Sequence, residues 1–247
     1  MRRSKPLAIT IAAFSMSVTI VGCSSATSAT GSATVTPQQV DDASQLAMIR
    51  AHQLVALRLY ELGQGEKAVK HAGHPAEEIF FSLSRSMRSS NAALTAELET
   101  SLRESKDLLL GGAPVAEVKA SFEKGWKVLE TAEAALVADD VRNAPAFRGA
   151  VVSHLIGGIK GEYGGAVMGG KLEMEIEYQD AWGALEVGTE RFDAARSDFG
   201  ATAAEISEHL DVLHKYIPGV VPPITVATTE QVDQEIASAQ ADIERAT

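Results

Sequence analysis

Apolar residues recur at steps of three and four along most of the chain. The first such stripe runs from about residue 38 to residue 62, and its members are Leu46, Ile49, Gln53, Ala56, Leu57 and Tyr60. This spacing is typical of one buried face of an amphipathic helix. The same pattern predicts further helices over residues 66–72, 75–89, 91–110, 115–137, from 145 or 146 to a turn at Gly169-Gly170, 171–216 and 228–245.

Glycine, proline and short polar runs separate these segments. We expect breaks at residues 63–65, 73–75, 111–114 and 139–145, and an extended strap over residues 218–224. Gly183, Gly188 and Gly200 are candidate kinks within the 171–216 helix. Asn91 and the pair Thr228 and Gln231 have the side chains that cap helix starts.

The pattern predicts an all-α fold, an antiparallel bundle of about six to eight helices. Alternating strand-like runs are missing, aromatic residues are 5% of the chain, and Ala, Leu, Glu and Val dominate. We interpret residues 38–247 as a single helical-bundle domain. The alternative is a split into two domains at residues 111–114.

The N-terminus has the composition of a signal peptide. Arg2, Arg3 and Lys5 precede a short apolar run over residues 7–21, which is too short for a comfortable membrane span. The run ends in Ile-Val-Gly-Cys, which resembles the bacterial lipobox, so residues 1–22 are predicted to be removed and Cys23 to be lipidated. The alternative is a plain secretory signal in which this single cysteine is incidental.

The residues after Cys23 are small and polar, and we expect residues 23–37 to form a flexible, disordered tether. The predicted protein is exported and held at the cell envelope by the lipid on Cys23. Because Ser24 follows the cysteine and no Asp retention signal is present, resemblance to other lipoproteins implies the outer membrane, facing the periplasm, if the cell has two membranes.

The charge of the chain excludes several kinds of partner. It carries 22 Lys and Arg against 33 Asp and Glu, a formal net charge of −11, and loss of the signal peptide makes the remainder more acidic. This argues against binding to nucleic acid or to an anionic lipid surface. No second apolar stretch is long enough to cross a bilayer, which argues against a permease or channel.

Two acidic residues lie at matching distances from the Gly169-Gly170 turn. In the stretch GEYGGAVMGGKLEMEIEYQD, Glu162 precedes the turn by about as many residues as Glu177 follows it. On two antiparallel helices, both carboxylates would reach the same level, about 11 Å from the turn. Asp180 follows Glu177 by one helical turn. This is how helical bundles build metal sites, and it is also how a solvated acidic face looks.

Three histidines are candidate nitrogen ligands. His71 and His74 form an H-x-x-H pair, and His52 lies one residue off the first apolar stripe. Together with Glu162 and Glu177 they form a mixed imidazole and carboxylate set, which suits divalent Fe, Mn or Zn better than Cu(I). The alternatives are that His74 caps a helix, His71 is a solvated cation at a helix end, and His52 is half-exposed.

Tyr163, Tyr178 and Asp180 are expected to support the ligands rather than to bind the ion. The tyrosines suit core positions with hydrogen-bonded hydroxyl groups. His154, His209 and His214 are scattered, and we interpret them as structural.

The sequence offers no enzyme motif, and we expect no enzyme activity. Neither G-x-S-x-G nor H-E-x-x-H occurs, and a lipidated Cys23 leaves no free thiol. The tetrapeptide from His74 to Glu77 spells H-x-x-E, which is seen in imelysin-like periplasmic proteins, some of them classed as peptidases. An imelysin-like hydrolase is therefore a third hypothesis.

Two stretches, LVALRLYELGQGEKAVKHAGHPAEEIF and EYGGAVMGGKLEMEIEYQDAWGALE, resemble a group of bacterial exported helical lipoproteins with a His-Pro turn and an EY…EYQD motif. The second stretch is also similar to the extracytoplasmic extension of some bacterial high-affinity iron permeases. The resemblance covers about a quarter of the chain. Its matching positions are His71, His74, Pro75, Glu162, Tyr163, Glu177, Tyr178 and Asp180.

The resemblance implies a helical extracytoplasmic protein in metal handling, most of all iron. Gly169 stands where the pattern has an acidic residue, so a ligand at that position would be missing here. Our leading hypothesis is a lipid-anchored protein that binds a divalent metal such as iron and has an envelope protein partner. The alternative is a non-catalytic interaction scaffold at the envelope.

Overall fold

The computed structural model describes residues 34–75 and 79–247, all of which belong to one compact unit. The predicted signal peptide, Cys23 and most of the tether lie outside the described residues, as does Glu77. The all-α class is confirmed, because the described residues form ten α-helices, one 3-10 helix and one pair of two-residue strands.

The first half contains α1 (Pro37–Glu61), α2 (Gly65–His74), α3 (Phe80–Ser90), α4 (Ala92–Leu110) and α5 (Val115–Leu136). The second half contains α6 (Asp139–Arg142), α7 (Pro145–Ala166), β1 (Val167–Met168), β2 (Lys171–Leu172), α8 (Glu175–Ala194), η2 (Arg196–Thr202), α9 (Ala203–Tyr216) and α10 (Thr229–Ala246).

Side-chain caps fix where several helices begin. The Asn91 side chain accepts a hydrogen bond from a backbone N–H of α4, and Thr228 with Gln231 forms the expected capping box of α10. An unforeseen capping box of Thr36 and Gln39, followed by Pro37 at the first helical position, begins α1. Helix α1 therefore begins at Pro37, the last residue of the predicted tether.

The expected break at residues 73–75 is wrong. Gly73 and His74 form the last turn of α2, and Pro75 still has helical φ and ψ angles. A glycine near a helix end costs little when tertiary contacts hold the helix, and the neighbouring His71 is fully buried. The short helix α6 similarly lies inside the expected polar connector.

The predicted helix over residues 171–216 is divided. Lys171 and Leu172 belong to a β-hairpin, whose turn at Gly169 and Gly170 has positive φ at both positions, as a two-residue hairpin turn of the I′ type requires. After α8 the chain passes through η2, where Gly200 adopts φ 52° and ψ −127°, outside the helical region. Such a conformation favours glycine and explains the division.

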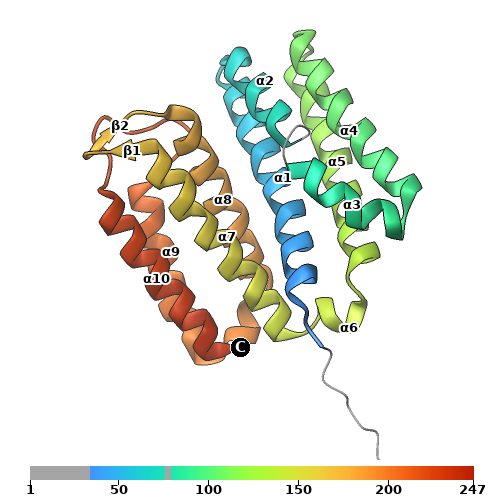
Figure 1. Cartoon of the computed structure of the whole chain (residues 1–247). Coiled ribbons are helices and arrows are strands. Elements are labelled where there is room, and N and C mark those ends of the chain that lie inside the picture. The colour runs from blue at the N-terminus through green and yellow to red at the C-terminus, as the bar shows by residue number, and fades with distance from the viewer. Residues whose placement is uncertain (1–33, 76–78) are drawn as a thin grey trace, which may run out of the picture. The chain divides into compact units, whose positions relative to one another are not determined.

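Helix α1 lies between the two halves of this unit (Figure 1). On one side it packs against α2, α3 and α5; on the other it packs against α7 and α8. Within the second half, α7 packs against α8 and α10, and α9 packs against α10. The largest group of buried apolar residues joins α1 and α2 to α7–α10, so the two halves share one core.

Gly183 allows α1 and α8 to approach closely. A methyl group added at Gly183 would lie 2.7 Å from Cγ2 of Val55 and 2.9 Å from the backbone oxygen of Ala51. Neither Gly183 nor Gly188 kinks the helix, because both lie within the continuous α8. This close approach brings the middle of α1 next to the start of α8, where the candidate site lies.

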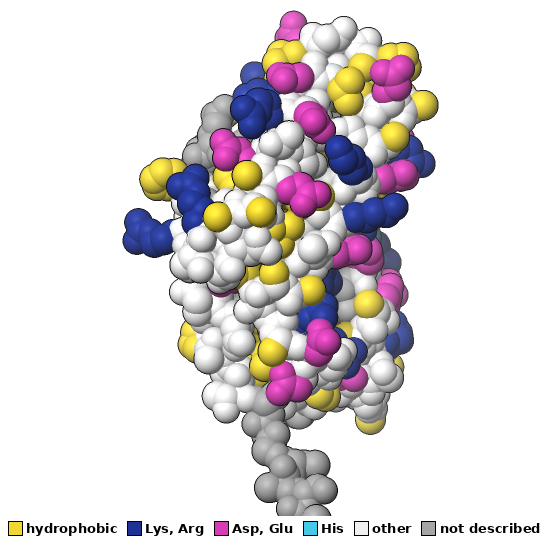
Figure 2. Space-filling model, turned by 90° about the vertical axis from the view of Figure 1, so that its right-hand side faces the viewer, with side chains coloured by type: hydrophobic (Ala, Val, Ile, Leu, Met, Phe, Trp, Pro, Cys, Tyr) yellow, Lys and Arg dark blue, Asp and Glu magenta, His cyan; other side chains and the backbone are white. Residues whose placement is uncertain are grey.

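The surface carries charges of both signs. On the face of Figure 1 where α4 and α5 lie, Figure 2 shows acidic and basic side chains interspersed, with no histidine in view. In the part of the chain that the structure describes, none of the helices combines the length and apolarity that crossing a bilayer requires.

Candidate metal centre

Asp180 lies at the centre of the candidate site. Its Oδ1 atom is 2.7 Å from Nδ1 of His52 and 2.8 Å from Nδ1 of His71. The three residues come from α8, α1 and α2, and all three side chains are buried. Their donor atoms lie within 4.8 Å of one another, so they form one group that could hold a metal ion.

The Asp180 carboxylate is strongly stabilised in its charged form. Burial alone would raise the pKa of this carboxyl, but the close contact of His52, the hydrogen bond from His71 and the positive charge of both rings outweigh burial and hold the pKa well below its ordinary value. A buried carboxylate that stays ionised is a good ligand for a hard or intermediate cation.

A chain of polar contacts fixes the orientation of His71. The amide of Gln179 donates a hydrogen bond from Nε2 to Glu175, at 3.2 Å, so its Oε1 faces Nε2 of His71 at 2.8 Å. Glu175 is in turn held by Lys67 through contacts of 2.7 and 2.8 Å. Turning the amide over would place its oxygen against the Glu175 carboxylate, so Nε2 of His71 donates a hydrogen bond to the amide oxygen of Gln179.

Nδ1 of His71 faces the centre of the site and donates a hydrogen bond to Oδ1 of the ionised Asp180 at 2.8 Å. A metal ion bound at this nitrogen would replace that proton, as ligand binding by histidine requires. A ligating histidine usually donates its other N–H to a neighbouring acceptor, which fixes the ring. Gln179 provides that acceptor for His71.

His52 presents a nitrogen without a hydrogen-bond partner. Although its Nδ1 lies 2.7 Å from Oδ1 of Asp180, the ring is not aligned for a hydrogen bond, and this buried atom has no other partner among the described residues. Such an atom costs about 1–3 kcal/mol when unsatisfied. An ion bound by His52 and Asp180 together would satisfy it.

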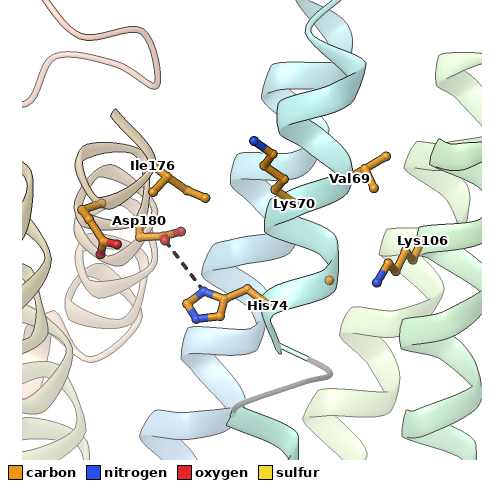
Figure 3. A pocket seen from close by; sticks show the side chains of 8 residues that line it. Val69, Lys70, His74, Lys106, Ile176 and Asp180 are labelled. Carbon is orange, nitrogen blue, oxygen red and sulfur yellow. Dashed lines mark ion pairs between the residues drawn. The ribbon is translucent and has the colours of Figure 1, made fainter. Parts of the chain in front are cut away.

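His74 lies at the solvent side of the site. Its Nδ1 is 3.9 Å from Oδ2 of Asp180, and 35% of its side chain is exposed. Figure 3 shows the His74 ring directed from α2 toward Asp180 on α8. Among the described residues, a cavity of about 440 Å³ adjoins both His74 and Asp180, whereas His52 is buried.

Glu162 and Glu177 form a second group with Asp180. Their carboxylate oxygens and that of Asp180 lie within 4.8 Å of one another, and both glutamates are half-buried. Glu162 lies near the end of α7 and Glu177 in the first turn of α8, so the hairpin between these helices places them at one level. Asp180 therefore belongs both to this carboxylate group and to the group that it forms with His52 and His71.

The structure therefore brings the five proposed ligands His52, His71, His74, Glu162 and Glu177 around one aspartate. Asp180, which we expected only to support the ligands, is in direct contact with His52 and His71. The role of these side chains in metal binding stays a prediction.

The two tyrosines are core residues of the bundle. The Tyr163 hydroxyl donates to the backbone oxygen of Ala227 at 2.9 Å, and burial raises its pKa to about 12 although this hydrogen bond opposes the rise. Burial and the nearby Tyr163 also raise the pKa of Tyr178, whose hydroxyl has no hydrogen-bond partner among the described residues. Their contribution to the site is packing next to Glu162 and Glu177.

Sequence reasoning missed Gln179 and its partners Glu175 and Lys67. The available signal was the four-residue spacing of Glu175 and Gln179, which places them on one helix face. The remaining histidines lie away from the site: His154 is exposed, His209 pairs with Glu235, and His214 with Glu186.

The donor set fits a divalent transition metal. Two imidazole nitrogens and one carboxylate, with open positions, are the ligands of many non-haem Fe(II) sites, and the same atoms accept Mn and Zn. Adjacent ligand atoms of one such ion lie about 3 Å apart, close to the distances of 2.7 and 2.8 Å from Oδ1 of Asp180 to Nδ1 of His52 and of His71.

Comparison with known proteins gave a family match for part of this chain. Neither a search of curated proteins nor a search of solved structures gave a match. Residues 138–247, which comprise α6 to α10, match the family described as the iron permease-associated 4-helix bundle domain. Glu162, Glu177 and Asp180 lie within the matched residues, whereas the three histidines of the site precede them. The C-terminal part of the chain is therefore similar to the iron permease-associated 4-helix bundle domain, which confirms the resemblance carried by the EY…EYQD stretch.

Proposed function

We propose that this protein binds a divalent metal ion, iron above others, at the centre formed by His52, His71 and Asp180. Glu162, Glu177 and His74 lie on the solvent side of that centre and provide further oxygen and nitrogen ligands as the ion enters or leaves. The protein holds the ion for envelope metal handling and does not transform a substrate.

One observation carries the proposal. Three buried side chains from three helices meet at this site. Nδ1 of His52 lies 2.7 Å and Nδ1 of His71 lies 2.8 Å from the same carboxylate oxygen of Asp180. Nε2 of His71 donates to Gln179, so the ring is oriented with Nδ1 toward Asp180, where a metal ion would replace the shared proton. The buried Nδ1 of His52 contacts the same oxygen without an aligned hydrogen bond, and a bound ion would satisfy this nitrogen.

Two further observations support the choice of iron and of location. The matched family is described as iron permease-associated, so a membrane-embedded permease is the partner we propose. The N-terminal sequence supports export and anchoring by a lipid on Cys23. Both observations support our proposal that the metal centre lies outside the cytoplasm, close to the membrane that holds such a permease.

The first test is elemental analysis of the protein purified without a histidine tag, followed by thermal melts with added Fe²⁺, Mn²⁺, Zn²⁺ and Cu²⁺. A ligand that binds only the folded state stabilises it by about 2.7 kcal/mol at a hundredfold excess over Kd. For a chain of this size, that corresponds to a rise in Tm of about 5–10 °C.

The variants His52→Gln and His71→Gln should abolish this rise, because each removes one imidazole but keeps a polar side chain of similar size. His154→Gln, at an exposed histidine of α7, is the matched control and should retain it. If wild-type protein contains no metal and no ion raises its Tm, the proposal is wrong and the interaction scaffold becomes the better hypothesis.

A further inference from the structure

The two carboxylate oxygens of Asp180 face different groups of side chains. Oδ1 contacts Nδ1 of His52 and Nδ1 of His71, at 2.7 and 2.8 Å. Oδ2 accepts no hydrogen bond from any residue that the structure describes, and it faces Nδ1 of His74 at 3.9 Å. Because the Asp180 side chain is only 2% exposed, Oδ2 is a buried and charged oxygen, which in a folded protein needs a cation or a hydrogen-bond donor.

Glu162, Glu177 and His74 provide donor atoms next to Asp180. Carboxylate oxygens of the two glutamates and one of Asp180 lie within 4.8 Å of one another. The His74 ring packs edge-on against the ring of His52, with ring centroids 4.8 Å apart, so a buried neighbour orients it. We call these three side chains with Oδ2 the outer group, and His52 and His71 with Oδ1 the inner group.

A single ion does not make use of both groups. Bonds from a metal ion to nitrogen or oxygen ligands are about 2.0–2.2 Å long, and an octahedral ion takes about six ligands in all. The inner group offers three donor atoms and the outer group four. A carboxylate whose two oxygens face different groups can instead bridge two ions, which lie about 3.5–4 Å apart in two-metal sites.

Repulsion among the outer carboxylates is a second reason for another ion. Glu162, Glu177 and Asp180 bring three negative charges together in a partly buried place, where like charges repel more strongly than in water. Lys70 and Lys106 line the adjoining cavity, but Figure 3 shows neither ammonium group directed at Asp180 as the His74 ring is. An ion in the inner group touches only one of the three carboxylates, so the repulsion between the two glutamates remains.

Resting on the proposed metal centre, we propose that the site holds two divalent ions bridged by Asp180. One ion is bound by the inner group and the other by the outer group, with one oxygen of Asp180 for each. Helical bundles build two-metal centres from glutamates and histidines that project inward from facing helices. The two positions differ in chemistry, because nitrogen ligands dominate the inner group and oxygen ligands the outer group, which therefore suits harder ions.

The test counts the bound ions and measures whether they are magnetically coupled. The whole protein, purified without a histidine tag, is dialysed against Mn²⁺, bound manganese is counted, and electron paramagnetic resonance spectra are recorded. We expect about two manganese ions for each protein and the spectrum of an exchange-coupled pair, because a bridging carboxylate holds the ions close together. Glu162→Gln combined with Glu177→Gln should leave about one manganese with the spectrum of an isolated ion.

Two further variants make the test specific. Glu177→Gln alone removes one oxygen donor and should lower the affinity for the second manganese at least tenfold, and circular dichroism shows that each variant is folded. The matched control combines Glu99→Gln with Glu208→Gln, at exposed glutamates of α4 and α9. It changes the net charge by the same amount as the first double variant and should retain both ions.

A single manganese in wild-type protein, unaffected by the glutamate substitutions, would overturn the second ion and leave the proposed metal centre standing. Two ions without magnetic coupling would overturn the bridge through Asp180. A coupled pair in the variant that lacks both Glu162 and Glu177 would overturn the role of the outer group. Protein that binds no manganese, and no other metal in the melts above, would overturn the metal centre itself and the second ion with it.

Discussion

Gln179 connects a surface ion pair with the buried centre of the site. Lys67 holds Glu175, Glu175 orients the amide of Gln179, and that amide accepts a hydrogen bond from Nε2 of His71, which orients the ring. An amide in this position costs little to the fold and leaves the charge of the site unchanged. Its effect is on the direction of the imidazole lone pair.

We expect Gln179→Leu to weaken metal binding by about ten- to a hundredfold, because loss of the partner of a ligating histidine has effects of this size. Titration calorimetry with Mn²⁺ measures the change. In ¹⁵N NMR spectra of Zn-loaded wild-type protein, His71 should hold its proton on Nε2.

The control for this variant is Gln240→Leu, which removes an amide that donates to the backbone oxygen of Ser153 between α10 and α7. It should leave the affinity unchanged. If Gln179→Leu binds Mn²⁺ as tightly as wild type, the orientation of His71 does not depend on Gln179.

At the scale of single residues, the sequence identified the candidate ligands but not the relative importance of each residue to the site. His52, His71, His74, Glu162 and Glu177 could be selected from spacing and from resemblance. The central position of Asp180 and the contact of Gln179 with His71 could not be predicted, because both depend on how α8 is rotated about its axis relative to α1 and α2. That rotation follows from side-chain packing between segments more than 100 residues apart, which a local pattern does not contain.

Among the elements, the contact between α1 and α8 determines whether the site can form. Gly183 lies at a close approach of the two helices, three residues after Asp180 and therefore on nearly the same face of α8. Any side chain there would meet both a side chain and the backbone of α1.

We expect Gly183→Ala to lower the free energy of unfolding by about 1–3 kcal/mol, since overpacking of a tight core contact has this cost. It should also weaken metal binding, because His52 moves away from Asp180 when α1 is displaced. Thermal melts and Mn²⁺ titration measure the two effects.

Gly188→Ala on the same helix is the control. A methyl group there would lie 3.6 Å or more from its nearest neighbours, which is ordinary contact, and alanine favours the helix by about 0.8–1 kcal/mol. We expect it to be neutral or stabilising. Equal destabilisation by both substitutions would contradict the importance of the close approach at Gly183.

Most helices could be predicted from periodicity and caps, as α1, α4, α5, α7 and α10 illustrate. The division of residues 171–216 could not be placed, because three glycines were equivalent in sequence. Only Gly200 adopts a left-handed conformation, whereas Gly183 serves a helix contact. Sequence alone does not separate a glycine needed for its φ angle from one needed for its small size.

For the whole molecule, the notable feature is that the site crosses the boundary of the matched family. The carboxylates lie in residues 138–247, and the histidines lie on α1 and α2. Because α1 packs between the two halves, the C-terminal helices alone lack both the imidazole ligands and part of the shared core.

We therefore expect a fragment of residues 138–247 to bind Mn²⁺ at least a hundredfold more weakly than the protein with residues 34–247. Titration calorimetry measures the affinities, and circular dichroism shows whether the fragment is folded. A folded fragment with undiminished affinity would mean that Glu162, Glu177 and Asp180 bind the ion without the histidines.

The contact of Asp180 with histidines of two other helices has a consequence for how fast the protein is degraded. With an ion bound as proposed, residues 52, 71 and 180 are joined by a removable cross-link that closes a loop of roughly a hundred residues, as a disulfide would. The loaded protein would then resist unfolding and proteases better than the empty one. An envelope that degrades loosely folded proteins would retain the carriers that hold cargo and clear those that do not.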